Sequence, residues 1–173
     1  MTIEQPRHRT LATIDLDLLV MTLGNGEGGY YNAATGDMLT IMDGDVITGD
    51  AEDIDLDDPA WIGIGAEDSR DKYRDMSDFA DAVTDPVIAD RLARALNGAG
   101  AFRRFTNTVQ EAEPRLDLIW HRFAEARAVS RAIDWLVDND LCDEIEAALA
   151  VQERADQAER ALGEAARWVW DHS

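Results

Sequence analysis

Apolar residues in the second half of the chain recur every three or four positions, which is the spacing of one helix face. The pattern predicts a helix after Asp68-Ser69, a second over residues 87–96 after Asp85-Pro86, and a third over residues 101–110. Aspartate caps helix N-termini well and proline suits a first turn, so the first two starts are clearly marked. A longer helix is expected from Pro114, with an apolar stripe of Leu116, Ile119, Trp120, Phe123, Ala126, Ile133 and Val137.

The last stretch, from residue 143 to 172, also has a near-helical period, but its apolar face is narrow and rich in alanine. Trp168 and Trp170 stand at its end, and aromatic anchors dominate protein interfaces. We therefore consider both tryptophans candidate partner-binding residues, and self-association through this helix would give a homo-oligomer. The alternative is that the helix packs back on its own domain. The predicted organisation is one domain over residues 1–141 with an appended helix over residues 142–173.

The first third of the chain has a different pattern. Tyr30-Tyr31 and residues 38–41 flank a polar segment, and Thr35-Gly36 supplies the positive φ of a hairpin turn. Residues 61–64 alternate as a strand does and predict a third strand beside the hairpin. Residues 43–58 carry eight acidic and no basic side chains, which predicts an extended, solvated connector. The expected fold class is α+β, with a small N-terminal antiparallel sheet of two or three strands packed by four or five C-terminal helices.

Two glycines separate the helix that ends near Leu96 from the helix that begins at Ala101. Gly98 stands where a helix C-terminus favours a residue that tolerates positive φ, and Gly100 gives a second such position. The helical spacing of Phe102 and Phe105 predicts that both rings point into the protein.

Arg103 and Arg104 lie between these two rings and must leave that face, close to a helix N-terminus whose free N–H groups favour an anion. With Gly98 and Gly100 they form a candidate site for a small anion or a nucleic-acid phosphate. Arg122 or His121 from the next helix is a further candidate for this site. The alternative is structural, since an arginine pair among 36 acidic residues commonly forms ion pairs with its own chain.

Several short motifs resemble the uncharacterised bacterial family UPF0158. They occur in the family's order between about residues 28 and 141, at residues 30–38, 61–64, 68–73, 76–79, 100–105, 120–123 and 135–136. The resemblance implies a short helix that begins near Asp15, where the residues alone fit a strand or a helix, and it implies no particular activity. The family's pattern commonly has a basic residue where Ala99 and Thr106 stand here, which weakens a phosphate-binding hypothesis for this chain.

The formal net charge of −20 disfavours nonspecific binding to nucleic acid or to an anionic membrane, because the summed field repels phosphates. It does not exclude nucleic acid at a concave, locally basic site. A basic protein surface is the natural counterpart of such a chain. No apolar run has the length of a signal peptide or of a membrane helix, so we expect a cytoplasmic protein.

Candidate chemistry is sparse. Cys142 is the single cysteine, which rules out an internal disulfide and a zinc ribbon. Asp53, Asp55 and Asp57 begin like a calcium-binding loop, but glycine at its sixth position and glutamate at its twelfth are missing. We therefore expect no catalytic residue, metal site or cofactor. The predicted function is a non-enzymatic, acidic binding or regulatory protein that acts through a basic protein partner, with anion binding at residues 98–104 as the alternative.

Overall fold

A computed structural model describes residues 7–48, 54–112 and 114–170 and divides the chain into two compact units. The sheet unit comprises Met1–Glu67 and Val129–Val151, and the helical unit comprises Asp68–Ala128 and Gln152–Ser173. The predicted organisation, one domain over residues 1–141 with an appended helix over residues 142–173, stays a prediction. Two long helices, α5 (Pro114–Asp138) and α6 (Glu144–Arg167), supply residues to both cores.

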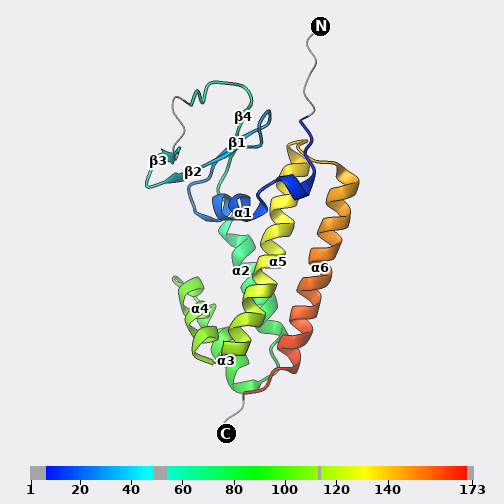
Figure 1. The fold of residues 1–173 in the computed structure, drawn as a ribbon. Coiled ribbons are helices and arrows are strands. Elements are labelled where there is room, and N and C mark those ends of the chain that lie inside the picture. Colours follow the sequence, from blue (N-terminus) through cyan, green and yellow to red (C-terminus); the bar gives the residue numbers. More distant parts are fainter. Residues whose placement is uncertain (1–6, 49–53, 113, 171–173) are drawn as a thin grey trace. The chain divides into compact units, whose positions relative to one another are not determined.

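The sheet unit contains four antiparallel strands in the order β3-β2-β1-β4 (Figure 1). The elements are a 3-10 helix at Leu11–Thr13, α1 at Leu16–Gly24, β1 at Gly29–Asn32, β2 at Met38–Met42, β3 at Asp45–Ile47 and β4 at Trp61–Ile64. The hairpin of β1 and β2 is confirmed, with Tyr30 paired to Leu39. The third predicted strand is confirmed as β4, where Ile62 pairs with Tyr31.

Local chemistry explains the hairpin turn. The side-chain oxygen of Asn32 accepts the N–H groups of Ala34 and Thr35 at 2.9 and 3.1 Å. Gly36 follows with a φ of 81°, which glycine adopts without a steric penalty. An asparagine that binds its own backbone and a glycine with positive φ are sufficient to close this turn.

The prediction of an extended connector over residues 43–58 is wrong in part, because this segment contains the additional strand β3. Asp43 and Gly44 have φ values of 53° and 81° and form the turn between β2 and β3. The Glu27 carboxylate accepts both of their N–H groups at 2.8 Å. The residue that stabilises this turn lies 16 positions earlier in the chain, so the local acidic pattern gave no indication of a strand. Residues 49–53 of the connector lie outside the described residues.

The core of the sheet unit packs α1 and parts of α5 and α6 with the sheet. Asp15 caps α1, because its carboxylate accepts the Leu18 N–H at 3.0 Å, which confirms the helix expected there. The hydroxyls of Thr22 and Thr40 lie 3.0 Å apart and join α1 to β2 in the interior. The buried apolar residues are Leu11, Ile14, Leu19, Tyr31, Ala33, Ile64, Val129, Ala132, Ile133, Leu136, Leu141, Cys142 and Ala147.

The helical unit contains α2 (Ser69–Ala82), α3 (Pro86–Ala95) and α4 (Ala101–Ala112), with the first part of α5 and the last part of α6. The Asp68 carboxylate accepts the Arg70 N–H at 2.9 Å, and that of Asp85 accepts the Val87 and Ile88 N–H groups at 3.1 Å. Both predicted caps are therefore confirmed. With five helices after the sheet in the described residues, the α+β fold class is confirmed.

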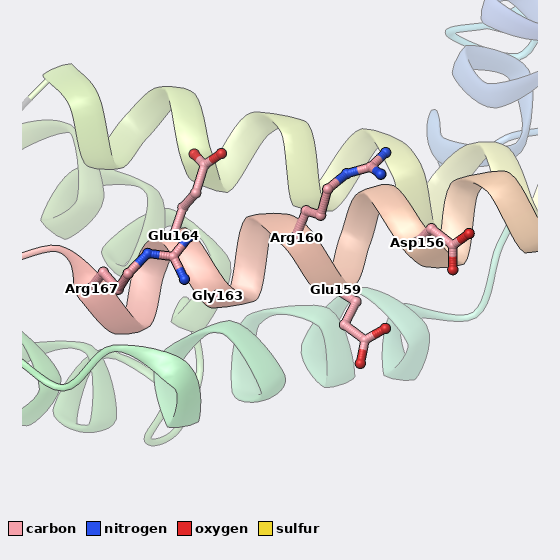
Figure 2. A pocket seen from close by; sticks show the side chains of 6 residues that line it. All are labelled: Asp156, Glu159, Arg160, Gly163, Glu164 and Arg167. Carbon is pink, nitrogen blue, oxygen red and sulfur yellow. The ribbon is translucent and has the colours of Figure 1, made fainter.

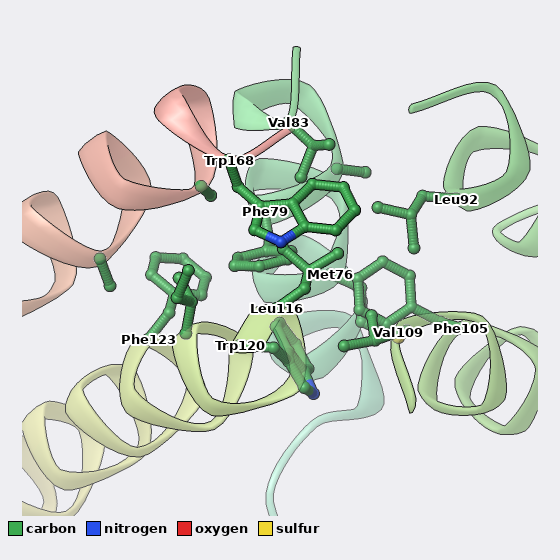
Figure 3. Packing of buried hydrophobic residues seen from close by; sticks show 14 of the residues in the cluster. Met76, Phe79, Val83, Leu92, Phe105, Val109, Leu116, Trp120, Phe123 and Trp168 are labelled. Carbon is green, nitrogen blue, oxygen red and sulfur yellow. The ribbon is translucent and has the colours of Figure 1, made fainter. Parts of the chain in front are cut away.

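Aromatic rings dominate the core of the helical unit, as Figure 3 shows. Phe79 of α2 lies with its ring centroid 6.3 Å from that of Phe105 and 5.2 Å from that of Trp120. The Phe105 and Trp120 centroids are 4.8 Å apart in an edge-to-face arrangement. Rings at these distances and angles add favourable quadrupole contacts to their large buried area.

Candidate functional site

The segment between α3 and α4 adopts the predicted backbone but only half of the predicted side-chain arrangement. Gly98 and Gly100 have φ values of 78° and 79°, as expected for residues that release one helix and begin another. Phe105 is fully buried, whereas Phe102 is 55% exposed, so the prediction that both rings point inward is wrong for Phe102. Phe102 belongs to the first turn of α4, beyond the edge of the core, and the Lys72 ammonium lies 5.8 Å from its ring centroid.

Arg104 turns back onto the end of α3. Its guanidinium donates hydrogen bonds to the carbonyls of Asn97 and Ala99 and a longer one, 3.4 Å, to that of Gly98. These carbonyls follow the last turn of a helix and lack partners within it, so Arg104 acts as a side-chain cap. Arg103 is exposed and makes no hydrogen bond or ion pair with a described residue.

Arg122 belongs to a different region of the helical unit. Its guanidinium donates two hydrogen bonds to the Glu164 carboxylate of α6, one of them at 3.2 Å. Arg104 and Arg122 line separate concavities, so the structure does not bring the proposed anion-site residues together. His121 lies on the exposed face of α5 with its Nε2 atom 3.2 Å from the Asp117 carboxylate.

Trp168 and Trp170 both pack within the helical unit. Trp168 is only 5% exposed and belongs to the aromatic core, while Trp170 is half-buried. The Trp170 backbone N–H donates to the buried Asp85 carboxylate at 3.0 Å, and the Arg91 guanidinium lies 5.9 Å from the Trp170 ring centroid. The C-terminal helix therefore packs back on its own unit. A partner-binding role for the two tryptophans stays a prediction, and it requires Trp168 to leave this core.

A concavity that the sequence did not indicate lies between the start of α5 and the end of α6. Its volume is about 590 Å³, and Arg115, Arg122, Arg167 and Glu164 line it. Arg115 and Arg122 are seven residues apart on α5, and Glu164 and Arg167 are three residues apart on α6, so each pair shares one helix face. Which face of α5 meets which face of α6 depends on tertiary packing, and this is why sequence spacing alone did not reveal the cluster.

The electrostatics of this concavity centre on Glu164. The hydrogen bond from Arg122 lowers the pKa of the Glu164 carboxyl, and the charges of Arg122, Arg167 and Arg115 lower that pKa further. Glu164 is therefore ionised at neutral pH and faces three guanidiniums.

Cys142 is unsuited to nucleophilic chemistry. The thiol is buried, and burial raises its pKa, as do the charges of Glu146, Asp143 and Asp140. The thiolate, which is the reactive form, is disfavoured in such surroundings.

Across residues 7–48, 54–112 and 114–170, no three His, Cys, Asp or Glu side chains gather into a group that could hold a metal ion. The acidic sequence that begins like a calcium loop starts at Asp53, which lies outside the described residues. Over the same ranges no helix has both the length and the apolar character needed to cross a membrane.

Charge is distributed very unevenly between the two units. The sheet unit has twenty acidic and three basic residues, a formal charge of −17, and the helical unit has sixteen acidic and thirteen basic residues, a charge of −3. Nearly all of the net charge of −20 therefore belongs to the sheet unit.

The sequence of this chain is similar to that of one known protein family. The sequence model described as "Uncharacterised protein family (UPF0158)" matches residues 63–158. A curated UPF0158 protein from Pseudomonas aeruginosa is 30% identical over 136 residues, which cover 75% of this chain and 84% of the relative. No solved structure matches the chain significantly. The family model covers more than half of the residues and the relative most of them, so the chain belongs to the UPF0158 family.

Proposed function

We propose that this protein is a non-enzymatic binding protein whose sheet unit binds a basic protein partner. The observation that carries the proposal is the segregation of charge, with a formal −17 in the sheet unit against −3 in the helical unit. A concentrated field of one sign accelerates encounter with a partner of the opposite sign and selects against partners of the same sign.

The carboxylates of the sheet unit are available to a partner. Fourteen of its sixteen described acidic residues are exposed. Among the described residues, the ion pairs of these carboxylates are those of Glu67 with Arg131 and of Asp140 with His8. Most of these acidic side chains therefore have no basic partner among the described residues, and a basic surface would supply one.

A mixed apolar and acidic surface, which we name the β2–β3 patch, lies at the β3 edge of the sheet. It consists of Met42, Asp43, Asp45 and Ile47. Asp45 pairs with Met42, and Ile47 with Thr40, so Met42, Asp45 and Ile47 share one face of the sheet. Met42 is 55% and Ile47 48% exposed. Exposed apolar side chains bordered by carboxylates suit a basic, amphipathic protein segment, and the carboxylates repel nucleic-acid phosphates.

Affinity capture with charge variants tests this proposal. The tagged chain is used to capture proteins and nucleic acids from native lysate, with and without nuclease treatment. A variant with Asp43, Asp45, Asp55, Asp57 and Asp58 changed to Asn is tested beside it. Asn retains the side-chain oxygen that accepts backbone N–H groups at positions 55 and 58, so these turns are preserved. We expect a basic protein to bind the wild type in a salt-sensitive manner and to be lost from this variant.

The matched control carries the same charge change on the helical unit. It replaces Asp81 and Asp156 with Asn and Glu125, Glu153 and Glu159 with Gln, all of them exposed positions. We expect the control to retain the partner. Equal loss from both variants would mean that only total charge matters, and recovery of nucleic acid in place of a basic protein would overturn the proposal.

A further inference from the structure

The concavity between the start of α5 and the end of α6, which we name the arginine groove, combines three guanidiniums with an apolar floor. Its residues include Arg115, Ile119 and Arg122 on α5, Glu164 and Arg167 on α6, and Trp168 directly after α6. All of them belong to the helical unit. A volume of about 590 Å³ lies within the range of small-molecule sites, roughly 300–1,000 Å³.

The guanidinium donors of the arginine groove are largely unused. Arg122 donates to Glu164, but Arg115 and Arg167 make no hydrogen bond or ion pair with a described residue. Each guanidinium carries about five N–H donors in a planar fork that matches the geometry of carboxylates and phosphates. Three positive charges face one negative charge here, so the groove is locally cationic although the chain as a whole is acidic.

The floor of the groove is rigidly held. Ile119 is 1% and Trp168 5% exposed, and both belong to the core of the helical unit. The backbone at Trp170 is fixed by its hydrogen bond to Asp85. The guanidiniums therefore stand on a rigid, preformed part of the core, which reduces the entropy lost on binding.

The Glu164 carboxylate occupies the position that a ligand carboxylate or phosphate would take against Arg122. The pair is exposed, with 57% and 36% of the two side chains accessible, so it contributes little stability and can be displaced. Figure 2 shows a neighbouring concavity on α6. Glu164 and Arg167 also line this second concavity, together with Arg160. The arginines thus continue along the helix on both sides of Glu164.

We propose that the arginine groove binds the phosphate or carboxylate group of a small organic anion, with Arg115 and Arg167 as the principal donors and Glu164 as an internal competitor. An apolar part of the ligand would lie against the exposed Val169 side chain, beside Ile119 and Trp168. This site differs from the predicted one at residues 98–104, where the donors of Arg104 already bind backbone carbonyls. It is independent of the proposed partner surface, which belongs to the sheet unit.

Calorimetric titration of the full chain with inorganic pyrophosphate and, separately, with citrate tests this inference. We expect saturable binding of at least one probe with one site per chain, and the preferred probe identifies phosphate or carboxylate as the ligand group. Changing Arg115 and Arg167 to Gln should weaken binding about tenfold or more, because two charge-assisted interactions are lost. The control with Arg70 and Arg103 changed to Gln has the same charge and alters exposed arginines of the same unit outside the groove.

A second pair of variants uses the internal competitor. Glu164→Gln should tighten binding several-fold because it frees Arg122. Glu111→Gln, which frees Arg91 elsewhere in the helical unit, should leave binding unchanged.

Circular dichroism checks the fold of every variant. If the Arg115/Arg167 variant does not fold, the comparison of the two glutamate variants decides the test. Absence of saturable binding, equal weakening in both arginine variants, or equal affinity of Glu164→Gln and Glu111→Gln would overturn the inference.

Discussion

The sheet unit and the helical unit use charge in opposite ways. In the sheet unit twenty acidic residues face three basic ones, and most described carboxylates are exposed without a basic partner. In the helical unit thirteen basic residues nearly balance sixteen acidic ones, and ion pairs such as Arg91–Glu111 and Arg127–Asp78 occur on its surface. The net charge of −20 is therefore a property of one unit, and it does not describe the surroundings of every site.

This difference changes what the total charge implies. A net charge of −20 would repel phosphates at every part of the surface only if the field were uniform. At physiological salt, charges farther apart than about 8 Å are largely screened, so a ligand responds mainly to its nearest groups. In the arginine groove the nearest groups are three guanidiniums and one carboxylate. One chain can therefore present an acidic surface to a basic protein and a cationic groove to a small anion.

The largest predicted effect concerns the aromatic core of the helical unit. Phe105→Ala should destabilise the protein by about 3–5 kcal/mol, because it removes a fully buried ring that contacts Phe79 and Trp120. Phe102→Ala, three residues earlier and 55% exposed, should change stability by less than about 0.5 kcal/mol. Urea unfolding monitored by circular dichroism measures the free energy of unfolding of both variants. A similar loss of stability in the two would contradict the buried position of Phe105 and the exposed position of Phe102.

The second prediction addresses the backbone of the sheet unit. A Cβ atom at Gly28, where φ is +80°, would lie 2.0 Å from the Ile64 carbonyl oxygen, so β4 would have to move. Gly26 has a φ of +85° but open space around it. Gly26→Ala should cost about 1–2 kcal/mol for the left-handed backbone alone, and Gly28→Ala should cost more. Hydrogen exchange of the β4 amides would show the added effect in Gly28→Ala, and equal exchange in both variants would argue against the clash.

A third prediction tests the charge difference directly. Self-repulsion should destabilise the sheet unit, and added salt should relieve it. Alkylation of the buried Cys142 reports opening of the sheet unit, so its rate should fall several-fold with salt. The control is Ala80→Cys with Cys142→Ser, which places the thiol in the core of the helical unit. A fall of the same size at position 80 would show that the two units respond alike.

The smallest effect is expected at Glu164. Because the folded-state pKa of this carboxyl lies below its ordinary value of 4.5, its ion pair stabilises the fold above pH 4.5, and the stabilisation is lost as pH falls through the folded pKa. Glu164→Gln should therefore be less stable than wild type at neutral pH, by at most about 1 kcal/mol for so exposed a pair. Unfolding measured below pH 4.5 should show the two proteins converge, and a difference independent of pH would exclude the ion pair as its cause.

Local signals in the sequence determined much of the secondary structure. Asp85-Pro86 marked the start of α3 because a capping carboxylate and a fixed φ act within one turn of the chain. Thr35-Gly36 marked the first hairpin for the same reason, since its hydrogen bonds join residues two to four positions apart. Short-range chemistry of this kind can be read without knowledge of the fold.

Tertiary structure decided the features that depend on distant partners. Strand β3 depends on Glu27, which binds the turn from 16 and 17 positions away. The burial of Trp168 depends on the core of the helical unit, to which distant residues such as Phe79 of α2 and Trp120 of α5 also belong. The arginine groove exists because Arg115 of α5 and Arg167 of α6 are brought together by helix packing. Helical spacing fixes which side chains share a face, but the partner of each face is set by the burial of apolar area over the whole unit.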